Sequence, residues 1–158
     1  MNLKKWKPYI ISIAIAVGVG ALSGLLSMSG MEAYGEIAIK PTLTPPGWLF
    51  PVVWTVLYTL MGISAARVWL TTDSTQRSRG LNIYVAQLVV NFFWSLIFFN
   101  AQAFGFAVLW LILLWILVLL MILQFYKVDR FAALLQIPYL IWLTFALYLN
   151  IGVWVLNM

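Results

Sequence analysis

The stretch 81–126, LNIYVAQLVVNFFWSLIFFNAQAFGFAVLWLILLWILVLLMILQFY, contains no charged residue. A helix that crosses a bilayer needs about 20 consecutive apolar residues, so this stretch is too long for one crossing. Its clearest polar interruption is Asn100-Ala101-Gln102-Ala103. The stretch therefore predicts two spans, 81–99 and 104–126, joined as a tight helical hairpin in which Asn100 ends the first helix.

The rest of the chain is also strongly apolar, with 65% hydrophobic and 8% charged residues overall. An ordinary soluble domain has about 25% charged residues. Further apolar runs cover 9–28, 48–70 and 131–156. Lipid offers backbone groups no partner, so runs of this length must be helices, and the alternation typical of a β-barrel is absent. We expect an all-α membrane protein, a five-transmembrane-helix bundle that forms a single transmembrane domain over residues 1–158.

The basic residues predict the orientation of these spans. With five spans, the side of the N-terminus receives eight of the nine basic residues: Lys4, Lys5, Lys7, Arg67, Arg77, Arg79, Lys127 and Arg130. The opposite side receives Lys40, with Glu32 and Glu36 nearby. This asymmetry predicts a multi-pass protein of the cell membrane with its N-terminus in the cytoplasm and its C-terminus outside. The net charge of +5 therefore indicates topology and not nucleic-acid binding.

The first span has a second interpretation. Lys4-Lys5-Trp6-Lys7 before an apolar run resembles a secretory signal, with Ala21-Leu22-Ser23 as a cleavage site. The run continues through Met28, which favours a retained span. Small residues at four-residue spacing, Ala16, Gly20 and Gly24, let helices approach closely in lipid, as do Gly62 and Ala66 on the second span. This contact can lie inside the bundle, which we favour for the first span, or between the subunits of a homodimer.

Composition excludes several chemistries. The chain has no histidine and no cysteine, so zinc sites, histidine-ligated haem and His-dependent nucleophiles cannot be built. No acidic residue falls within a predicted span, which argues against a carboxylate proton relay or an ion-coupled pump. We therefore predict no metal site, no obligatory cofactor and no conventional catalytic residue.

Aromatic and amide side chains remain as candidate functional groups. Trp54 and Tyr58 lie one turn apart on the second span, and Trp142 and Phe145 follow Pro138 on the fifth. The third span carries a stripe on one helical face: Gln87, Asn91, Trp94, Ser95 and Phe98. Such a set predicts a pocket for a flat apolar ligand. The alternative is that the amides only form hydrogen bonds between helices.

The segment Thr44-Pro45-Pro46-Gly47-Trp48 predicts a rigid connection into the second span. Thr44 is a candidate N-cap, and the prolines suit the first turn of a helix. Pro51 and Pro138 lie further in and are expected to bend their helices. We expect residues 29–43 to form a loop over the outside mouth of the bundle.

Three motifs resemble those of the TspO/MBR family, the translocator proteins or tryptophan-rich sensory proteins. They are TPPGWLFPVVWTVLY at 44–58, QLVVNFFWSLIFF at 87–99 and IPYLIWLTFALYLN at 137–150. The resemblance covers nearly the whole chain. It implies a five-helix bundle, often dimeric, with a pocket beneath the first loop that binds porphyrins and other tetrapyrroles, benzodiazepine-type ligands and, in animals, cholesterol.

By matching position, the resemblance implies a pocket lined by Trp54, Asn91, Trp94, Ser95, Phe98, Trp142, Phe145 and Ala146, with Tyr34 from the first loop. We add Tyr58, which shares a face with Trp54. The expected ligand is protoporphyrin IX or a haem-like porphyrin. Because histidine is absent, we expect metal-free porphyrin to bind at least as well as haem.

The resemblance also implies an alternative activity, because bacterial relatives are associated with light-dependent porphyrin breakdown linked to the positions of Trp54 and Trp142. Transport of tetrapyrroles or sterol-like lipids is a further alternative, although no internal repeat typical of transporters is visible. Two positions depart from the family pattern: Leu43 stands where Trp is common, and Ala33 precedes Tyr34 in place of Trp. With fewer aromatic rings in the first loop, both the affinity for tetrapyrroles and the photochemical activity that the resemblance implies are in question.

Overall fold

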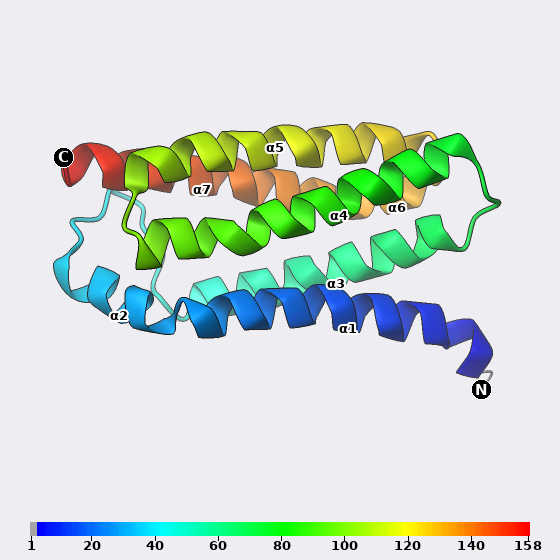
Figure 1. The fold of residues 1–158 in the computed structure, drawn as a ribbon, viewed down its shortest axis with the longest axis horizontal. Coiled ribbons are helices and arrows are strands. Elements are labelled where there is room, and N and C mark those ends of the chain that lie inside the picture. Colours follow the sequence, from blue (N-terminus) through cyan, green and yellow to red (C-terminus); the bar gives the residue numbers. More distant parts are fainter. Residues whose placement is uncertain (1–2) are drawn as a thin grey trace.

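The computed structural model describes residues 3–158, which form helices and connecting segments without a strand. The elements in chain order are α1 Leu3–Leu26, α2 Met28–Ile37, α3 Leu49–Trp69, α4 Thr75–Ser95, the π-helical turn η1 Leu96–Asn100, α5 Phe104–Tyr126, α6 Arg130–Leu135 and α7 Ile137–Leu156. The N- and C-termini lie at opposite ends of the bundle (Figure 1). We name these two ends the N-terminal end and the C-terminal end.

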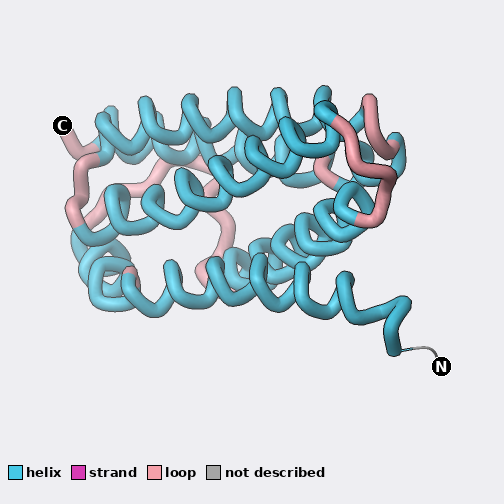
Figure 2. Tube along the Cα trace, turned by 45° about the vertical axis from the view of Figure 1, so that its right-hand side comes forward, coloured by secondary structure: helices cyan, strands magenta, loops and turns pink. Residues whose placement is uncertain are grey.

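Within residues 3–158, five helical segments are long and apolar enough to cross a membrane, which confirms the predicted bundle. They are Lys4–Leu26, Leu49–Trp69, Thr75–Asn100, Phe104–Tyr126 and Arg130–Leu156. The third segment begins six residues before the predicted 81–99, because Ser74 caps α4 by accepting a hydrogen bond from the backbone N–H of Arg77. Figure 2 shows the connecting segments at the two ends, with one of them reaching inward to the start of α3.

The predicted hairpin turns where the sequence indicated. The third span ends at Asn100 with η1, and Gln102 adopts a positive φ of 50° in the turn. The Asn100 side-chain amide donates a hydrogen bond to the carbonyl of Leu26, at the end of α1, over 2.8 Å. Since the last carbonyls of a helix lack intrahelical partners, this bond fixes the C-terminal end of α1 to the hairpin.

The first connection differs from the prediction. Most of the expected loop 29–43 is the helix α2, packed against η1. Thr44 does not cap α3: its hydroxyl donates to the carbonyl of Pro41 over 2.6 Å, and α3 begins only at Leu49. The reason is that Pro45 precedes Pro46: a residue before proline disfavours helical geometry, so Pro45 is a poor first helical residue for a Thr44 cap.

The two prolines expected to bend their helices differ in outcome. Pro51 falls in the first turn of α3, where its missing N–H has no helical partner to lose. Pro138 likewise occupies the first turn of α7. The fifth span is interrupted just before Pro138, at Gln136, which separates α6 from α7, as a proline within this span predicts. Only Pro51 was expected too far into its helix.

The small-residue face of α1 packs against α3 within the chain. A Cβ on Gly62 would lie 2.5 Å from the Cα of Ile13, so only glycine allows this approach. Ser12 donates a hydrogen bond to the Gly62 carbonyl over 2.7 Å, and the ring of Tyr58 fills the space above Gly20. These contacts hold α1 against the half of α3 that is nearer the N-terminal end.

Candidate functional site

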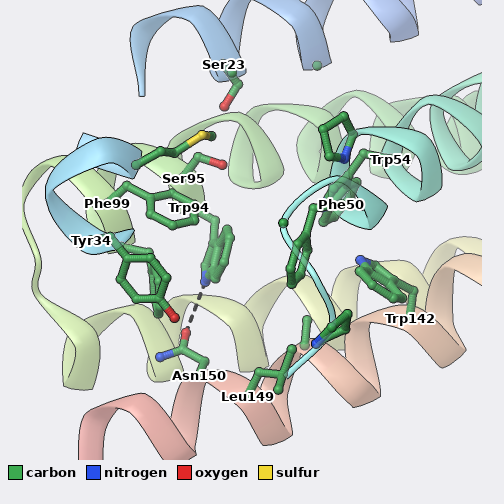
Figure 3. A pocket seen from close by; sticks show the side chains of 18 of the residues that line it. Ser23, Tyr34, Phe50, Trp54, Trp94, Ser95, Phe99, Trp142, Leu149 and Asn150 are labelled. Carbon is green, nitrogen blue, oxygen red and sulfur yellow. Dashed lines mark hydrogen bonds between the residues drawn. The ribbon is translucent and has the colours of Figure 1, made fainter. Parts of the chain in front are cut away.

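A cavity of about 580 Å³ occupies the half of the bundle nearer the C-terminal end. Residues of α1, α2, α3, α4, η1 and α7 line it, and the segment 38–48 lies over it. Figure 3 shows its side chains converging from these elements. The volume falls within the range of about 300–1,000 Å³ that small-molecule pockets occupy.

Most of the residues that the sequence singled out meet in this cavity. Nine of the ten line it: Tyr34, Trp54, Tyr58, Asn91, Trp94, Ser95, Phe98, Trp142 and Ala146. The tenth, Phe145, does not line it; its ring packs between Trp142 and Tyr148, with centroid distances of 5.7 and 6.1 Å. Phe145 therefore supports a lining ring from behind and does not face the cavity.

One wall of the cavity consists of rings from α3 and α7. The indoles of Trp54 and Trp142 meet edge to face, with centroids 6.4 Å apart and planes at 90°. Phe50, one turn before Trp54, lies 5.9 Å from Trp142, and Tyr58 lies 5.6 Å from Trp54. Edge-to-face and offset rings attract each other, so the wall is held in place by its own members.

The opposite wall is built from α4, η1 and α2. Trp94 stacks on Phe98 at 4.9 Å, and the Tyr34 ring lies 5.3 Å from Phe98. The indole N–H of Trp94 donates to the side-chain oxygen of Asn150 over 3.2 Å (Figure 3). The indole N–H is the only donor of the Trp94 side chain and is bonded to Asn150, so Trp94 presents an apolar ring face to the cavity.

The amides of the third span divide into two roles. Asn91 lines the cavity and donates to the Tyr139 hydroxyl over 2.7 Å, and that hydroxyl donates to Gln87 over 2.8 Å. Gln87 and Tyr139 are almost fully buried and do not line the cavity. The stripe therefore contains two kinds of residue: Gln87 joins helices, whereas Asn91 joins helices and also lines the cavity.

The indole nitrogen of Trp142 is a free donor at the cavity wall. It is buried and has no hydrogen-bond partner among residues 3–158. Figure 3 shows this nitrogen on the side that faces Phe50, toward the cavity. An unpaired buried N–H costs about 1–3 kcal/mol, and because this nitrogen is buried, a ligand acceptor reaches it only after a neighbouring side chain moves.

Sequence reasoning missed several lining residues, of which Lys40 carries the most chemistry. Among the described residues that line the cavity, Lys40 is the only charged one. Its Nζ lies 5.4 Å from the centroid of the Tyr34 ring, at the C-terminal end of the bundle. Burial raises the pKa of Tyr34, so the phenol stays neutral and can donate a hydrogen bond. In the sequence, Lys40 served only to predict the topology of the spans. Its position as the one basic residue on the side of the C-terminus was the signal that could have marked it as a ligand contact.

The remaining missed residues follow from geometry. Phe50 could have been found from its position one turn before Trp54. Asn150 stands out as a polar residue one turn beyond Ala146, but nothing in the sequence relates it to its partner Trp94, which lies 56 residues away. Ser23, Gly24 and Met31 line the cavity because α1 and α2 close its side, and a loop had been expected there.

The described residues do not form a metal site. No group of three or more His, Cys, Asp or Glu side chains occurs within residues 3–158. Among the lining side chains, only Met31, Tyr34 and Tyr58 are of a type that ligates haem iron. The raised pKa of Tyr34 opposes the phenolate form that iron would need. The arrangement suits a ligand held by ring contacts and hydrogen bonds.

The fold and the cavity together define a multi-pass α-helical membrane protein with an aromatic cavity between its helices. The sequence profile of the TspO/MBR family matches residues 11–155. The chain therefore belongs to the TspO/MBR family.

Individual relatives agree with this assignment over nearly the full length. The chain is 38% identical over 158 residues to "Protein CrtK" of Rhodobacter capsulatus, which covers 99% of this chain and 95% of that protein. It is 35% identical over 153 residues to "Tryptophan-rich protein TspO" of Chlorobaculum tepidum, covering 94% and 97%. It is 33% identical over 152 residues to "Translocator protein" of Homo sapiens, covering 94% and 89%.

Proposed function

We propose that this protein binds a porphyrin, such as protoporphyrin IX, or a similar flat apolar molecule in the cavity. The observation that carries the proposal is the cavity of about 580 Å³ with tryptophans from three helices, Trp54, Trp94 and Trp142, in its walls. Broad ring faces favour a broad, flat, polarisable ligand, and few polar groups interrupt them.

The polar groups favour a ligand with acceptors at its edge. Lys40 at the rim can pair with a carboxylate, and the Ser95 hydroxyl offers a hydrogen bond inside. A porphyrin with two carboxylate side chains has this division into an apolar ring and an anionic edge. In the proposed orientation, with the N-terminus in the cytoplasm of a cell-membrane protein, Lys40 lies at the outer surface and the carboxylates stay near water.

The direct test is a titration of the protein in lipid nanodiscs with protoporphyrin IX, followed by quenching of tryptophan fluorescence. Trp54→Ala and Trp142→Ala should each weaken affinity by about ten-fold, because each removes ring contacts worth about 1 kcal/mol or more. Trp6→Ala is the matched control, since Trp6 is 49% exposed and does not line the cavity. Unchanged affinity in both cavity variants would contradict the proposal.

Haem provides a second arm of the same titration. We expect metal-free protoporphyrin to bind at least as tightly as haem, because the chain has no histidine for the iron and Tyr34 is held neutral. If haem binds clearly more tightly than protoporphyrin, and Met31→Leu or Tyr34→Phe removes this difference, the substituted residue is an axial ligand. That result would contradict the expectation that metal-free porphyrin binds at least as tightly. Whether the protein is a monomer or a homodimer is measured independently, from the mass of the nanodisc-embedded particle.

A second candidate function is light-dependent breakdown of the bound porphyrin by dioxygen. The observation that favours it is a continuous set of oxidisable rings: Trp54 lies 6.4 Å from Trp142, 5.6 Å from Tyr58 and 6.2 Å from Tyr139. Illumination in air should give a product spectrum that is absent under argon and absent in Trp54→Phe. Equal spectra in air, under argon and in Trp54→Phe would contradict the breakdown activity and leave binding as the only proposed function.

Porphyrin flux into proteoliposomes, compared with empty vesicles, tests the transport alternative.

A further inference from the structure

The cavity reaches the surface of the bundle along the gap between α1 and α3. Ala21 on α1 and Thr55 on α3 both line the cavity and are both exposed. Thr55 lies six residues into α3, roughly 9 Å along the helix axis at 1.5 Å per residue. This opening, which we call the α1–α3 window, therefore lies beside the apolar part of the spans and faces lipid.

The window begins where close packing of the two helices ends. Toward the N-terminal end, the ring of Tyr58 fills the space above Gly20 and Gly62 touches Ile13. One turn further along α1, a Cβ added to Gly24 would meet no atom within 4 Å, although Gly24 lines the cavity. The helices thus separate just above Tyr58, and small residues border the gap.

Hydrogen bonds leave this gap free to widen. Ser12 ties α1 to α3 at Gly62, but nearer the C-terminal end Ser23 ties α1 to α4 through the Phe92 carbonyl, over 2.8 Å. Among the described residues, no hydrogen bond joins α1 to α3 beside Gly24 and Thr55. Side chains can therefore move apart at the window without breaking a bond between the helices.

At the water-facing end of the cavity, hydrogen bonds join the segment 38–48 to residues at the end of the chain, unlike at the α1–α3 window. The Asn157 side chain accepts a hydrogen bond from the Ile39 N–H at 2.9 Å and donates to the Ile39 carbonyl at 2.8 Å. The Tyr148 hydroxyl donates to the Thr42 carbonyl at 2.7 Å, and the Pro41 ring packs against Gly152. Lys40 leaves the rim in contact with water, but widening this side enough to pass the whole ring requires breaking three hydrogen bonds, so it is the more resistant route.

We propose that the ligand passes into and out of the cavity sideways, between α1 and α3, from the hydrocarbon region of the bilayer. The apolar ring slides through the window while its anionic edge stays near Lys40. The site therefore selects molecules that partition into membranes. This inference rests on the proposed porphyrin binding in the same cavity.

A cross-link across the window tests the route. The chain contains no cysteine, so Ala21→Cys with Thr55→Cys gives a single pair that a short thiol-bridging reagent can join. Protein in nanodiscs is mixed with phosphatidylcholine vesicles that contain protoporphyrin IX, and quenching is followed over time. Bridging before mixing should slow uptake by about ten-fold or more, and bridging after loading should slow release similarly, since a blocked window raises one barrier for both directions.

The matched control bridges the other end of the cavity, with Ile39→Cys and Asn157→Cys. This bridge should leave uptake within about two-fold of the unbridged protein, a factor worth well under 1 kcal/mol of barrier. Slowing by this bridge and not by the window bridge would overturn the proposal in favour of the water-facing route.

A second variant needs no cross-link. Gly24→Phe narrows the window, whereas Gly18→Phe places the same ring on α1 at an open position that does not line the cavity. Gly24→Phe should slow association and dissociation together, and Gly18→Phe should change neither rate. A weaker Kd with unchanged association would mean that the ring fills the cavity and would contradict the window. Failure of wild-type protein to bind at equilibrium would refute the proposed function, a result distinct from normal binding with unaltered rates.

Discussion

The indole N–H of Trp94 donates a hydrogen bond to the side-chain oxygen of Asn150, and the Asn150 amide donates in turn to the carbonyl of Phe104 over 3.0 Å. Asn150 is 1% exposed and lies on α7, while Trp94 lies on α4 and Phe104 begins α5. One amide thus joins three helices at the C-terminal end of the bundle. The same amide sets the orientation of a ring that lines the cavity.

Asn150→Leu should therefore lower both stability and affinity. The change leaves the Trp94 N–H and the Phe104 carbonyl without their partner, which costs about 1–3 kcal/mol for a buried group. Thermal unfolding of the detergent-solubilised protein should show a lower Tm, and protoporphyrin should bind more weakly because Trp94 loses its fixed orientation. Asn150→Asp keeps the oxygen that accepts from Trp94 but removes the amide that donates to Phe104. The two variants together therefore distinguish the contributions of the two hydrogen bonds. An unaltered Tm in Asn150→Leu would show that the bonds are not formed in solution.

Lys40→Met should weaken the binding of protoporphyrin but not of its dimethyl ester. Lys40 is the only charged residue among the described cavity-lining residues, and the ester carries no charge for it to attract. Because Lys40 is exposed, we expect a modest loss, about two- to five-fold at low salt, which shrinks as salt screens the pair. Titrations of both ligands at two salt concentrations check this. An equal loss for acid and ester would mean that Lys40 acts through packing on Tyr34.

Gln136→Leu should leave stability unchanged or raise it. Gln136 is fully buried at the break between α6 and α7, and neither polar atom of its side chain has a hydrogen-bond partner within residues 3–158. Replacing an unpaired buried amide with an apolar side chain removes a desolvation cost. A clear fall in Tm would show that Gln136 finds partners in the membrane.

Gln87→Leu is the matched comparison for that variant. Gln87 is equally buried, but it accepts a hydrogen bond from Tyr139, whose hydroxyl also accepts from Asn91. Its removal should lower stability by about 1–3 kcal/mol, since the Tyr139 hydroxyl loses a buried acceptor. The two glutamines should thus respond in opposite directions. Equal responses would contradict the hydrogen-bond pattern that distinguishes them.

Asp129 combines two roles at the N-terminal end, and two substitutions separate them. Its carboxylate lies 3.2 Å from Arg67 and accepts a hydrogen bond from the Ala132 N–H, which caps α6. Asp129→Asn keeps the cap and should cost little, because partly exposed ion pairs are worth about 0–1 kcal/mol. Asp129→Ala removes both and should cost about 1 kcal/mol more through the lost cap. Chemical denaturation of the two variants measures the difference, and equal losses would assign the effect to the ion pair.

The span pattern was accessible from the sequence because charge decides it locally. The fourth span was predicted at 104–126, where α5 lies, since Asn100-Ala101-Gln102-Ala103 interrupts an uncharged run. Helix starts were harder to predict. Thr44 is a typical N-cap residue, but α3 begins only at Leu49, beyond the two consecutive prolines that follow Thr44.

The cavity residues were accessible only in part. Trp54 was singled out by its spacing from Tyr58 on the second span, and Asn91 and Trp94 by their common face on the third span; all three line the cavity. Phe145 was placed in the same set, yet it lies behind Trp142, and Phe50 was left out although it faces the cavity. Gln87 and Asn91 share one stripe and differ in role, which no spacing rule distinguishes.

The sequence by itself determined that this chain is a bundle of five membrane-spanning helices without histidine or cysteine chemistry, because span length and the placement of charges need no tertiary contact. Only the tertiary structure decided which side chains enclose the cavity and where it opens. In lipid, the outer face of a helix is as apolar as its inner face, so hydrophobic pattern alone does not fix how each helix is turned about its axis. That rotation is set by contacts between distant residues, such as Gly62 on Ile13 and Trp94 on Asn150.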